Sequence, residues 1–264
     1  MNSILEVFKK TKVENRAALI AYLPAGFPSK EKSSEILRLI LDNGADMVEV
    51  GLPYSDPLMD GPTIQQAVEI SLENKTSIDD CFQIVKELST SKKPVLIMSY
   101  YSPIEKYGVS KFVENFASAN GAGVITPDLT IEEAGPWILK TTEQEIARVF
   151  VVAPSSKAAR LTKVASEVTG FVYAASLMGV TGTRAQVSSK AEELVANLRK
   201  TTDLPIAVGL GVSTPAQAKT VGAFADGVIV GSAFVKILLE NNDFEKAKTL
   251  IVELTQQLRA ALPR

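Results

Sequence analysis

Short apolar runs rich in valine and isoleucine recur along the whole chain. Few of them alternate polar with apolar residues, and this is the pattern of strands that are buried on both faces, as in a parallel sheet. The pattern therefore predicts eight parallel strands. They cover residues 17–23, 47–52, 95–100, 123–126, 149–153, 171–175, 206–210 and 227–230.

Amphipathic helical patterns fill the gaps between these strands. Two of them end directly before Gly44 and Gly121, where glycine is a common helix C-cap. Another starts after Ser213 and Thr214, which are favourable N-cap residues. The longest gap lies between the second and third strands, so we expect an extra element there, in the loop after the second strand. The expected helices are 30–43, 110–120, 161–169, 191–200, 215–221 and 244–261.

The alternation of strands and helices predicts an α/β fold, a (β/α)8 TIM barrel. The 264 residues match the length of about 250 that is typical of this fold. We therefore expect one catalytic domain over residues 1–264. A doubly wound open sheet is the alternative, but its Gly-x-Gly-x-x-Gly fingerprint is absent after the first strand, where residues 24–28 read Pro-Ala-Gly-Phe-Pro.

Charge and composition narrow the classes of function. The formal net charge is −2, from 28 basic and 30 acidic residues, which provides no field for nucleic acid or an anionic membrane. We expect a cytoplasmic protein, because the N-terminus lacks the apolar core of a signal peptide and no run reaches the roughly 18 apolar residues of a membrane span.

The chain has no histidine and a single cysteine, Cys81, which lies in an apolar helical pattern and is expected to be buried. Histidine-based catalysis is excluded, and no metal site is expected. Aspartate, glutamate, lysine, tyrosine or a cofactor must therefore carry any proton transfers.

Two carboxylates lie at the end of the second strand. Glu49 is inside the apolar strand itself, where a lone carboxylate is costly unless it is paired or functional. The loop 52–63 then contains three prolines, two aspartates and one glycine, and it includes Asp60. Asp60 could simply cap the following helix. Because active sites in such barrels lie at the C-terminal ends of the strands, we interpret both as candidate acid–base groups.

Glycine-rich turns follow the last three strands. They contain Gly182, Gly211 and the pair Gly231-Ser232. Backbone N–H groups at a helix N-terminus bind anions, and glycine allows a phosphate to approach the backbone closely. One such turn is weak evidence, since glycine occurs in any tight loop. Three at successive strand ends predict a phosphorylated ligand.

With these features in place, the chain resembles the tryptophan synthase alpha chain family over nearly its whole length. The most specific stretch is 49–65, which reads EVGLPYSDPLMDGPTIQ and matches the family pattern E-x-G-x-P-[FY]-S-D-P-x-x-D-G-P-x-I-Q. Residues 179–182 and 231–233 also match. The sequence departs from the family at Leu177-Met178, where Arg-Ser or Arg-Thr is more common, and at Leu129-Thr130, where Val-Pro is frequent.

The resemblance implies a lyase that cleaves indole-3-glycerol phosphate by retro-aldol chemistry to indole and glyceraldehyde 3-phosphate. It implies that Glu49 and Asp60 are catalytic; we assign the proton transfers to Glu49 and the indole nitrogen to Asp60. It also implies a beta-chain partner carrying pyridoxal phosphate, in an alpha2beta2 heterotetramer. No cofactor is expected in this chain.

Three tyrosines are further candidates for substrate contact. Tyr173 lies within the sixth strand and Tyr100 at the end of the third, and both could instead pack in the core. Tyr22 lies near the end of the first strand, where the family often has phenylalanine, and it could line the indole pocket or pack in the core. The alternatives to the alpha-chain activity are another phosphate-binding barrel enzyme such as a sugar-phosphate isomerase, a lyase without a beta partner, and a catalytically inactive barrel that regulates by binding.

Overall fold

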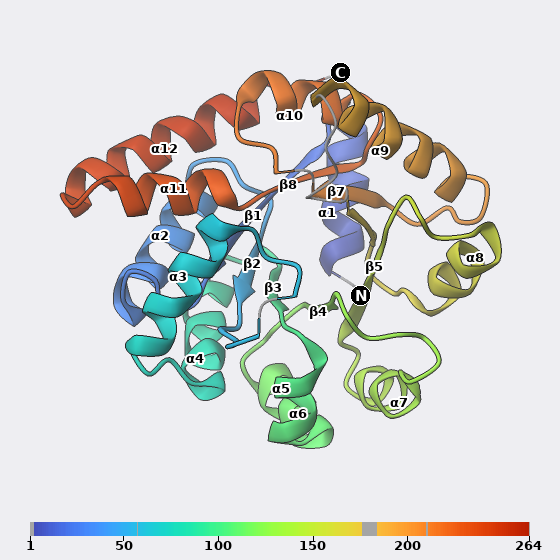
Figure 1. Cartoon of the computed structure of the whole chain (residues 1–264), viewed down its shortest axis with the longest axis horizontal. Helices are drawn as coiled ribbons and strands as arrows, with labels where there is room; N and C mark the ends of the chain where they lie inside the picture. The colour runs from blue at the N-terminus through green and yellow to red at the C-terminus, as the bar shows by residue number, and fades with distance from the viewer. Residues whose placement is uncertain (1–2, 57, 176–183, 210, 264) are drawn as a thin grey trace.

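The computed structural model describes residues 3–56, 58–175, 184–209 and 211–263. Its centre is a closed barrel of eight parallel strands in sequence order, surrounded by helices (Figure 1). This confirms the predicted (β/α)8 barrel and excludes the open sheet. The strands are β1 (Ala18–Pro24), β2 (Met47–Gly51), β3 (Val95–Met98), β4 (Gly123–Thr126), β5 (Ala147–Val152), β6 (Val172–Ala175), β7 (Ile206–Gly209) and β8 (Gly227–Val230).

All six predicted helices are present, and their ends agree within three residues except at Arg184, where one helix begins seven residues before the predicted 191. Further helices lie in gaps for which no helix range was predicted. The extra element between β2 and β3 is a second helix, so that α3 and α4 both lie there. The helices are α1 (Ser3–Val13), α2 (Lys30–Asp42), α3 (Pro62–Glu73), α4 (Ile78–Ser89), α5 (Tyr101–Tyr107), α6 (Val109–Ser118), α7 (Gly135–Glu143), α8 (Ala158–Glu167), α9 (Arg184–Leu198), α10 (Pro215–Gly222), α11 (Ser232–Glu240) and α12 (Phe244–Ala260).

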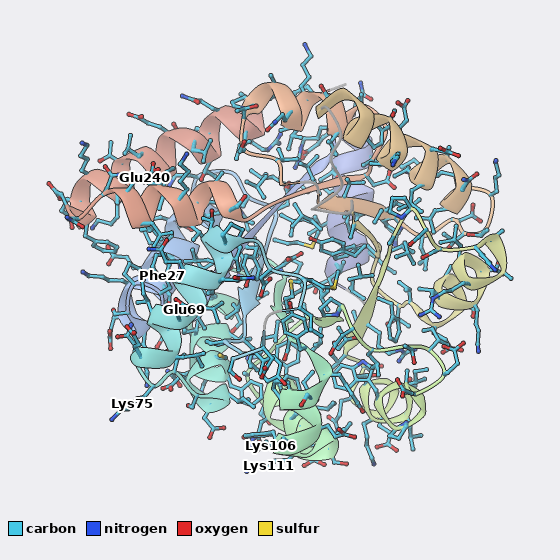
Figure 2. All side chains as sticks on the ribbon, in the orientation of Figure 1. Phe27, Glu69, Lys75, Lys106, Lys111 and Glu240 are labelled. Atoms are coloured by element: carbon cyan, nitrogen blue, oxygen red, sulfur yellow. The ribbon has the colours of Figure 1, made fainter. Side chains whose placement is uncertain are left out.

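Side chains alternate between the barrel interior and the helical layer, as the period of two in a strand requires. On β2, Val48 and Val50 pack outward into the large core beneath the helices, whereas Met47 belongs to the interior cluster. Glu49 and Gly51 therefore lie on the same inward face as Met47. Charged side chains such as Lys75, Lys106, Lys111 and Glu240 are exposed and project from the outer rim (Figure 2).

Helix α1, which the sequence pattern did not predict, closes the N-terminal end of the barrel. Ile4 and Phe8 are buried and join the interior cluster, and the Phe8 and Phe171 ring centroids are 5.7 Å apart. A Cβ at Gly123 or Gly227 would come within 3.0 and 3.2 Å of Ile4 and Phe8 respectively. Glycine at these two strand starts thus makes room for the helix.

Packing of the outer layer accounts for residues that were expected to be structural. Cys81 on α4 is fully buried, as predicted, and burial raises its thiol pKa to about 12, so it is a poor nucleophile. Trp137 on α7 is also fully buried, and its ring meets Tyr101 edge-on at 6.2 Å. In the part of the chain that the structure describes, no helix has the length and apolar character needed to cross a bilayer.

Candidate active site

Glu49 lies inside the barrel near the C-terminal end of β2. Its side chain is fully buried, and neither carboxylate oxygen has a hydrogen-bond partner among the described residues. Burial raises the Glu49 pKa to about 8, because the charged form loses its hydration without gaining a compensating cation. At neutral pH the group is therefore mainly protonated, and it can donate a proton.

Asp60 follows on the loop between β2 and α3, and this loop is tied to Tyr100. The Tyr100 hydroxyl accepts a hydrogen bond from the Met59 backbone N–H at 2.8 Å and donates one to the Asp60 carboxylate. The Gln65 side chain donates to the Asp60 carbonyl at 2.7 Å. Partial burial raises the Asp60 pKa, while the bond from Tyr100 opposes that rise.

Two tyrosines from different strands line the same interior space. Tyr22 on β1 is paired in register with Glu49 on β2, and Tyr173 extends from β6. Burial raises the pKa of both hydroxyls, and the negative charges of Asp60 and Glu49 raise them further. The structure thus places Glu49, Asp60, Tyr22, Tyr100 and Tyr173 around one space.

Sequence reasoning missed two glycines that make this arrangement possible. A Cβ at Gly51 would overlap the Tyr22 hydroxyl, and a Cβ at Gly209 would overlap the Tyr173 hydroxyl. Gly51 lies two residues beyond Glu49 and therefore faces the same interior space. That spacing of two is the signal in the sequence that could have identified it.

The predicted phosphate turns differ from one another in the structure. Helix α10 caps its own N-terminus, because the Gln217 side chain accepts from the backbone N–H groups of Ser213 and Thr214 at 2.9 and 3.2 Å. Helix α11 begins at Ser232 after Gly231, and no side chain of the described residues caps it. Of these two termini, α11 offers the free backbone N–H groups that an anion needs.

Gly211 and Gly182 are the other glycines of the predicted phosphate turns. Gly211 has a φ of 63°, in the left-handed region that favours glycine, and it lies in the turn before α10. Gly182 lies outside the described residues.

The loop that carries Asp60 also exposes apolar side chains. Leu58 is 79% exposed and Met59 is 47% exposed, directly before Asp60. The Tyr54 ring lies 5.6 Å from that of Tyr100, which attaches the start of the loop to the same tyrosine that holds Asp60. The loop therefore links the interior site to an apolar surface.

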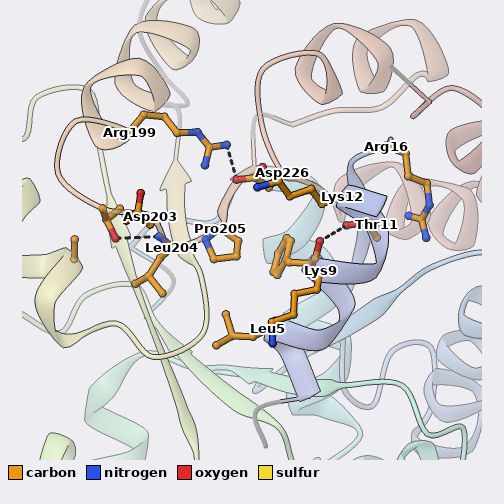
Figure 3. A pocket seen from close by; sticks show the side chains of 13 residues that line it. Leu5, Lys9, Thr11, Lys12, Arg16, Arg199, Asp203, Leu204, Pro205 and Asp226 are labelled. Carbon is orange, nitrogen blue, oxygen red and sulfur yellow. Dashed lines mark hydrogen bonds and ion pairs between the residues drawn. The ribbon is translucent and has the colours of Figure 1, made fainter. Parts of the chain in front are cut away.

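A separate cavity of about 580 Å³ lies at the opposite, N-terminal end of the barrel (Figure 3). Residues of α1 and of the segments before β7 and β8 form it, among them Leu5, Phe8, Lys12, Arg199, Pro205 and Asp226. Arg199 and Asp226 form an ion pair across it. Neither Glu49 nor Asp60 borders this cavity. Among the described residues, no cluster of three acidic or cysteine side chains is arranged to hold a metal ion.

Comparison with known proteins gives one consistent result. The family model described as tryptophan synthase alpha chain matches residues 8–262. The tryptophan synthase alpha chain of Streptomyces avermitilis is 51% identical over 253 residues, covering 94% of this chain and 91% of its own. That of Streptomyces coelicolor is 52% identical, with 94% and 93% coverage.

Solved structures agree with these matches. A chain from tryptophan synthase of M. tuberculosis superposes with a TM-score of 0.92 at 41% identity, covering 99% of this chain and 98% of its own. An aminoacrylate-bound form from the same organism gives a TM-score of 0.91 at 39% identity, with full coverage of both chains. The chain thus belongs to the tryptophan synthase alpha chain family, the lyases that cleave indole-3-glycerol phosphate to indole and glyceraldehyde 3-phosphate in tryptophan biosynthesis.

Proposed function

We propose that Glu49 and Asp60 carry the chemistry of this cleavage, with Glu49 as the proton carrier. The observation that carries the proposal is the fully buried Glu49 carboxyl, which has no partner in the described part of the chain and whose raised pKa keeps its proton at neutral pH. Retro-aldol cleavage must protonate the ring carbon that leaves, and it must remove the proton of the adjacent glycerol hydroxyl. One carboxyl group between these two atoms can serve both in turn.

The order of steps follows from the resting state of Glu49. The protonated carboxyl first gives its proton to the indole carbon, which makes the ring N–H more acidic and partly positive. The Asp60 carboxylate, held by Tyr100, stabilises that state. The ionised Glu49 then removes the hydroxyl proton as the carbon–carbon bond breaks, its electrons return to the ring, and the carbonyl forms. Glu49 ends protonated, so the cycle is balanced.

The substrate phosphate is proposed to bind at the uncapped start of α11, at Gly231 and Ser232, with Gly211 and Gly182 contributing from the neighbouring turns. The contrast with the self-capped α10 supports this assignment. Tyr22, Tyr100 and Tyr173 are proposed to bound the space for the rest of the substrate. Their convergence with the two carboxylates supports this role.

A beta-chain partner follows from membership of the family. We propose that the partner carries pyridoxal phosphate, that the assembly is an alpha2beta2 heterotetramer, and that it is cytoplasmic. The exposed Leu58 and Met59 beside Asp60 support a contact of this loop with the beta chain. Such a contact would order the loop and raise turnover, because closure of an active-site loop completes the arrangement of catalytic groups.

The direct test measures indole release from indole-3-glycerol phosphate by the purified chain, with and without a beta chain. Stoichiometric indole and glyceraldehyde 3-phosphate are expected, with a higher rate when the beta chain is present. A full rate without any response to the partner would favour a lyase that acts alone. No indole under either condition would favour an inactive binding subunit.

The phosphate assignment is tested with Ser232→Asp. An acidic residue in the first turn of a helix is compatible with folding, because it interacts favourably with the helix dipole, but it repels a phosphate bound there. Binding of glycerol 3-phosphate should weaken at least tenfold, while the melting temperature is kept. Ser213→Asp, at the self-capped α10, is the comparison and should have the smaller effect; the reverse ranking would place the phosphate at α10.

A further inference from the structure

The Tyr22 side chain extends from the proposed phosphate turn toward Glu49. At the base of its ring, a Cβ at Gly231 would lie 2.9 Å from Tyr22 Cδ1, so the ring rests against the turn that starts α11. At its far end, the hydroxyl lies over Gly51, two residues beyond Glu49 on β2. The side chain therefore begins beside the proposed phosphate turn and ends beside the reactive carboxyl.

The substrate has the same order of groups. Its phosphate is joined to the indole ring through a chain of three carbons, two of which carry hydroxyl groups. A substrate with its phosphate at α11 and its ring carbon at Glu49 must extend this chain in the same direction as the Tyr22 ring. The Tyr22 hydroxyl then lies at the Glu49 end of the chain, next to the hydroxylated carbon that is bonded to the indole ring.

The chemistry of the Tyr22 hydroxyl suits this position. The side chain is partly buried, and no hydrogen bond joins its hydroxyl to another of the described residues. Burial and the neighbouring carboxylates raise its pKa well above the usual value, so that it remains a neutral donor throughout the working pH range. A hydroxyl that the protein leaves unpaired can donate a hydrogen bond to a ligand that enters the site.

We propose that the Tyr22 hydroxyl binds a hydroxyl of the glycerol chain and so selects a hydroxylated three-carbon phosphate. This role rests on the proposed function and refines the expectation from the sequence, which left Tyr22 either lining the indole pocket or packing in the core. A phenylalanine at this position would keep the packing against Gly231 but would lose the polar contact. The expected selectivity arises because a site that hydrogen-bonds a substrate hydroxyl discriminates against an analogue without it.

The experiment compares Tyr22→Phe with the wild type on three ligands. These are indole-3-glycerol phosphate, glycerol 3-phosphate, and indole-3-propanol phosphate, which retains the ring and the phosphate but has no chain hydroxyl. One neutral hydrogen bond corresponds to about 3- to 10-fold in affinity. The variant should lose that factor for the first two ligands and bind the third as the wild type does.

Tyr101→Phe is the matched control, because Tyr101 packs against Trp137 in the outer layer, and it should bind all three ligands normally. Unchanged binding of all three ligands by Tyr22→Phe would overturn the inference. Equal weakening of all three would also overturn it, because ring packing rather than the hydroxyl would then be responsible. Failure of the proposed function would instead appear as a wild-type chain that does not cleave indole-3-glycerol phosphate.

Discussion

The two ends of the barrel differ in whether their buried ionisable side chains have partners. At the N-terminal end, Arg16 is 4% exposed, and its guanidinium donates to both Asp46 oxygens at 2.7 Å and to Glu14 at 2.6 Å. At the C-terminal end, Glu49 is equally enclosed but has no partner for either oxygen among the described residues. Both side chains are ionisable, and both come from the strands or their immediate starts.

This difference indicates what each end of the molecule does. A buried ion pair with bidentate geometry satisfies its charges and holds the elements it joins in place. A buried carboxyl group without a partner costs folding free energy, and such groups accumulate at functional sites. The N-terminal end therefore secures the fold with α1 inserted, while the C-terminal end retains an unsatisfied group for chemistry, as is general for this fold.

The largest expected effect is on catalysis at the C-terminal end. Glu49→Gln preserves shape but cannot transfer a proton, so the rate of indole release should fall about 10²- to 10⁴-fold. Glycerol 3-phosphate should still bind, because the phosphate turn is intact. Glu69→Gln, on the exposed face of α3, is the control and should cleave at the normal rate. Substantial activity in Glu49→Gln would remove Glu49 from the mechanism.

A change at the N-terminal end of the barrel should lower the free energy of unfolding and leave the rate of indole release unchanged. Arg16→Met leaves Asp46 without its bidentate partner, and breaking a buried pair in this way costs about 3–5 kcal/mol of unfolding free energy. Urea unfolding measures that loss, and indole release below the transition should retain its kcat. A fall in kcat as large as that of Glu49→Gln would contradict the separation of the two ends.

The pH dependence of cleavage tests the state of Glu49. Because its pKa is raised to about 8 and the protonated form starts the reaction, kcat/KM should be flat near neutrality and fall about tenfold per pH unit well above pH 8. A rate that instead rises with pH between 7 and 9 would mean that the ionised form starts the reaction. The measurement is indole release across pH 6 to 10.

The free energy of unfolding should also depend on pH through Glu49, and the raised pKa fixes the direction of that dependence. The folded pKa of about 8 lies above the ordinary 4.5, so the folded chain binds the proton more tightly, and the contribution of Glu49 to stability falls as pH rises from 4.5 to about 8. Glu49→Gln lacks this titration. Its unfolding free energy relative to the wild type should increase by roughly 2–4 kcal/mol across that window. A pH-independent difference would indicate an unperturbed Glu49.

The smallest expected effect on the isolated chain is at the surface of the catalytic loop. Leu58→Asp should leave basal indole release within about twofold, because this side chain is 79% exposed. It should weaken activation by a beta chain by about 1–2 kcal/mol in apparent affinity if the loop forms part of the contact. Leu139→Asp, at a 58% exposed position on α7, is the matched control, and an equal loss there would argue against a specific contact of the loop.

The elements that the sequence predicted well are those whose pattern is local. Eight apolar runs mark the eight strands, and the longest gap marks the extra helix between β2 and β3. Boundaries differed where local capping governs the end of an element: β3 stops at Met98, two residues before the predicted end, because Tyr100 becomes the N-cap of α5. Helix α1 was missed although its buried residues Ile4, Phe8 and Thr11 follow helical spacing, because charged residues are mixed among its few apolar ones and weaken the pattern.

By itself, the sequence determined that the chain forms alternating buried strands and helices and that a carboxylate lies within the second strand. These features follow from periodicity and from residue type, which are properties of neighbouring residues. Only the closed barrel decided that Glu49 has no partner among the residues that the structure describes, that Asp60 is held by Tyr100, and that Tyr22 extends from Gly231 to Gly51. Each of these depends on which side chains converge from different strands when the sheet closes, and no local pattern encodes that convergence.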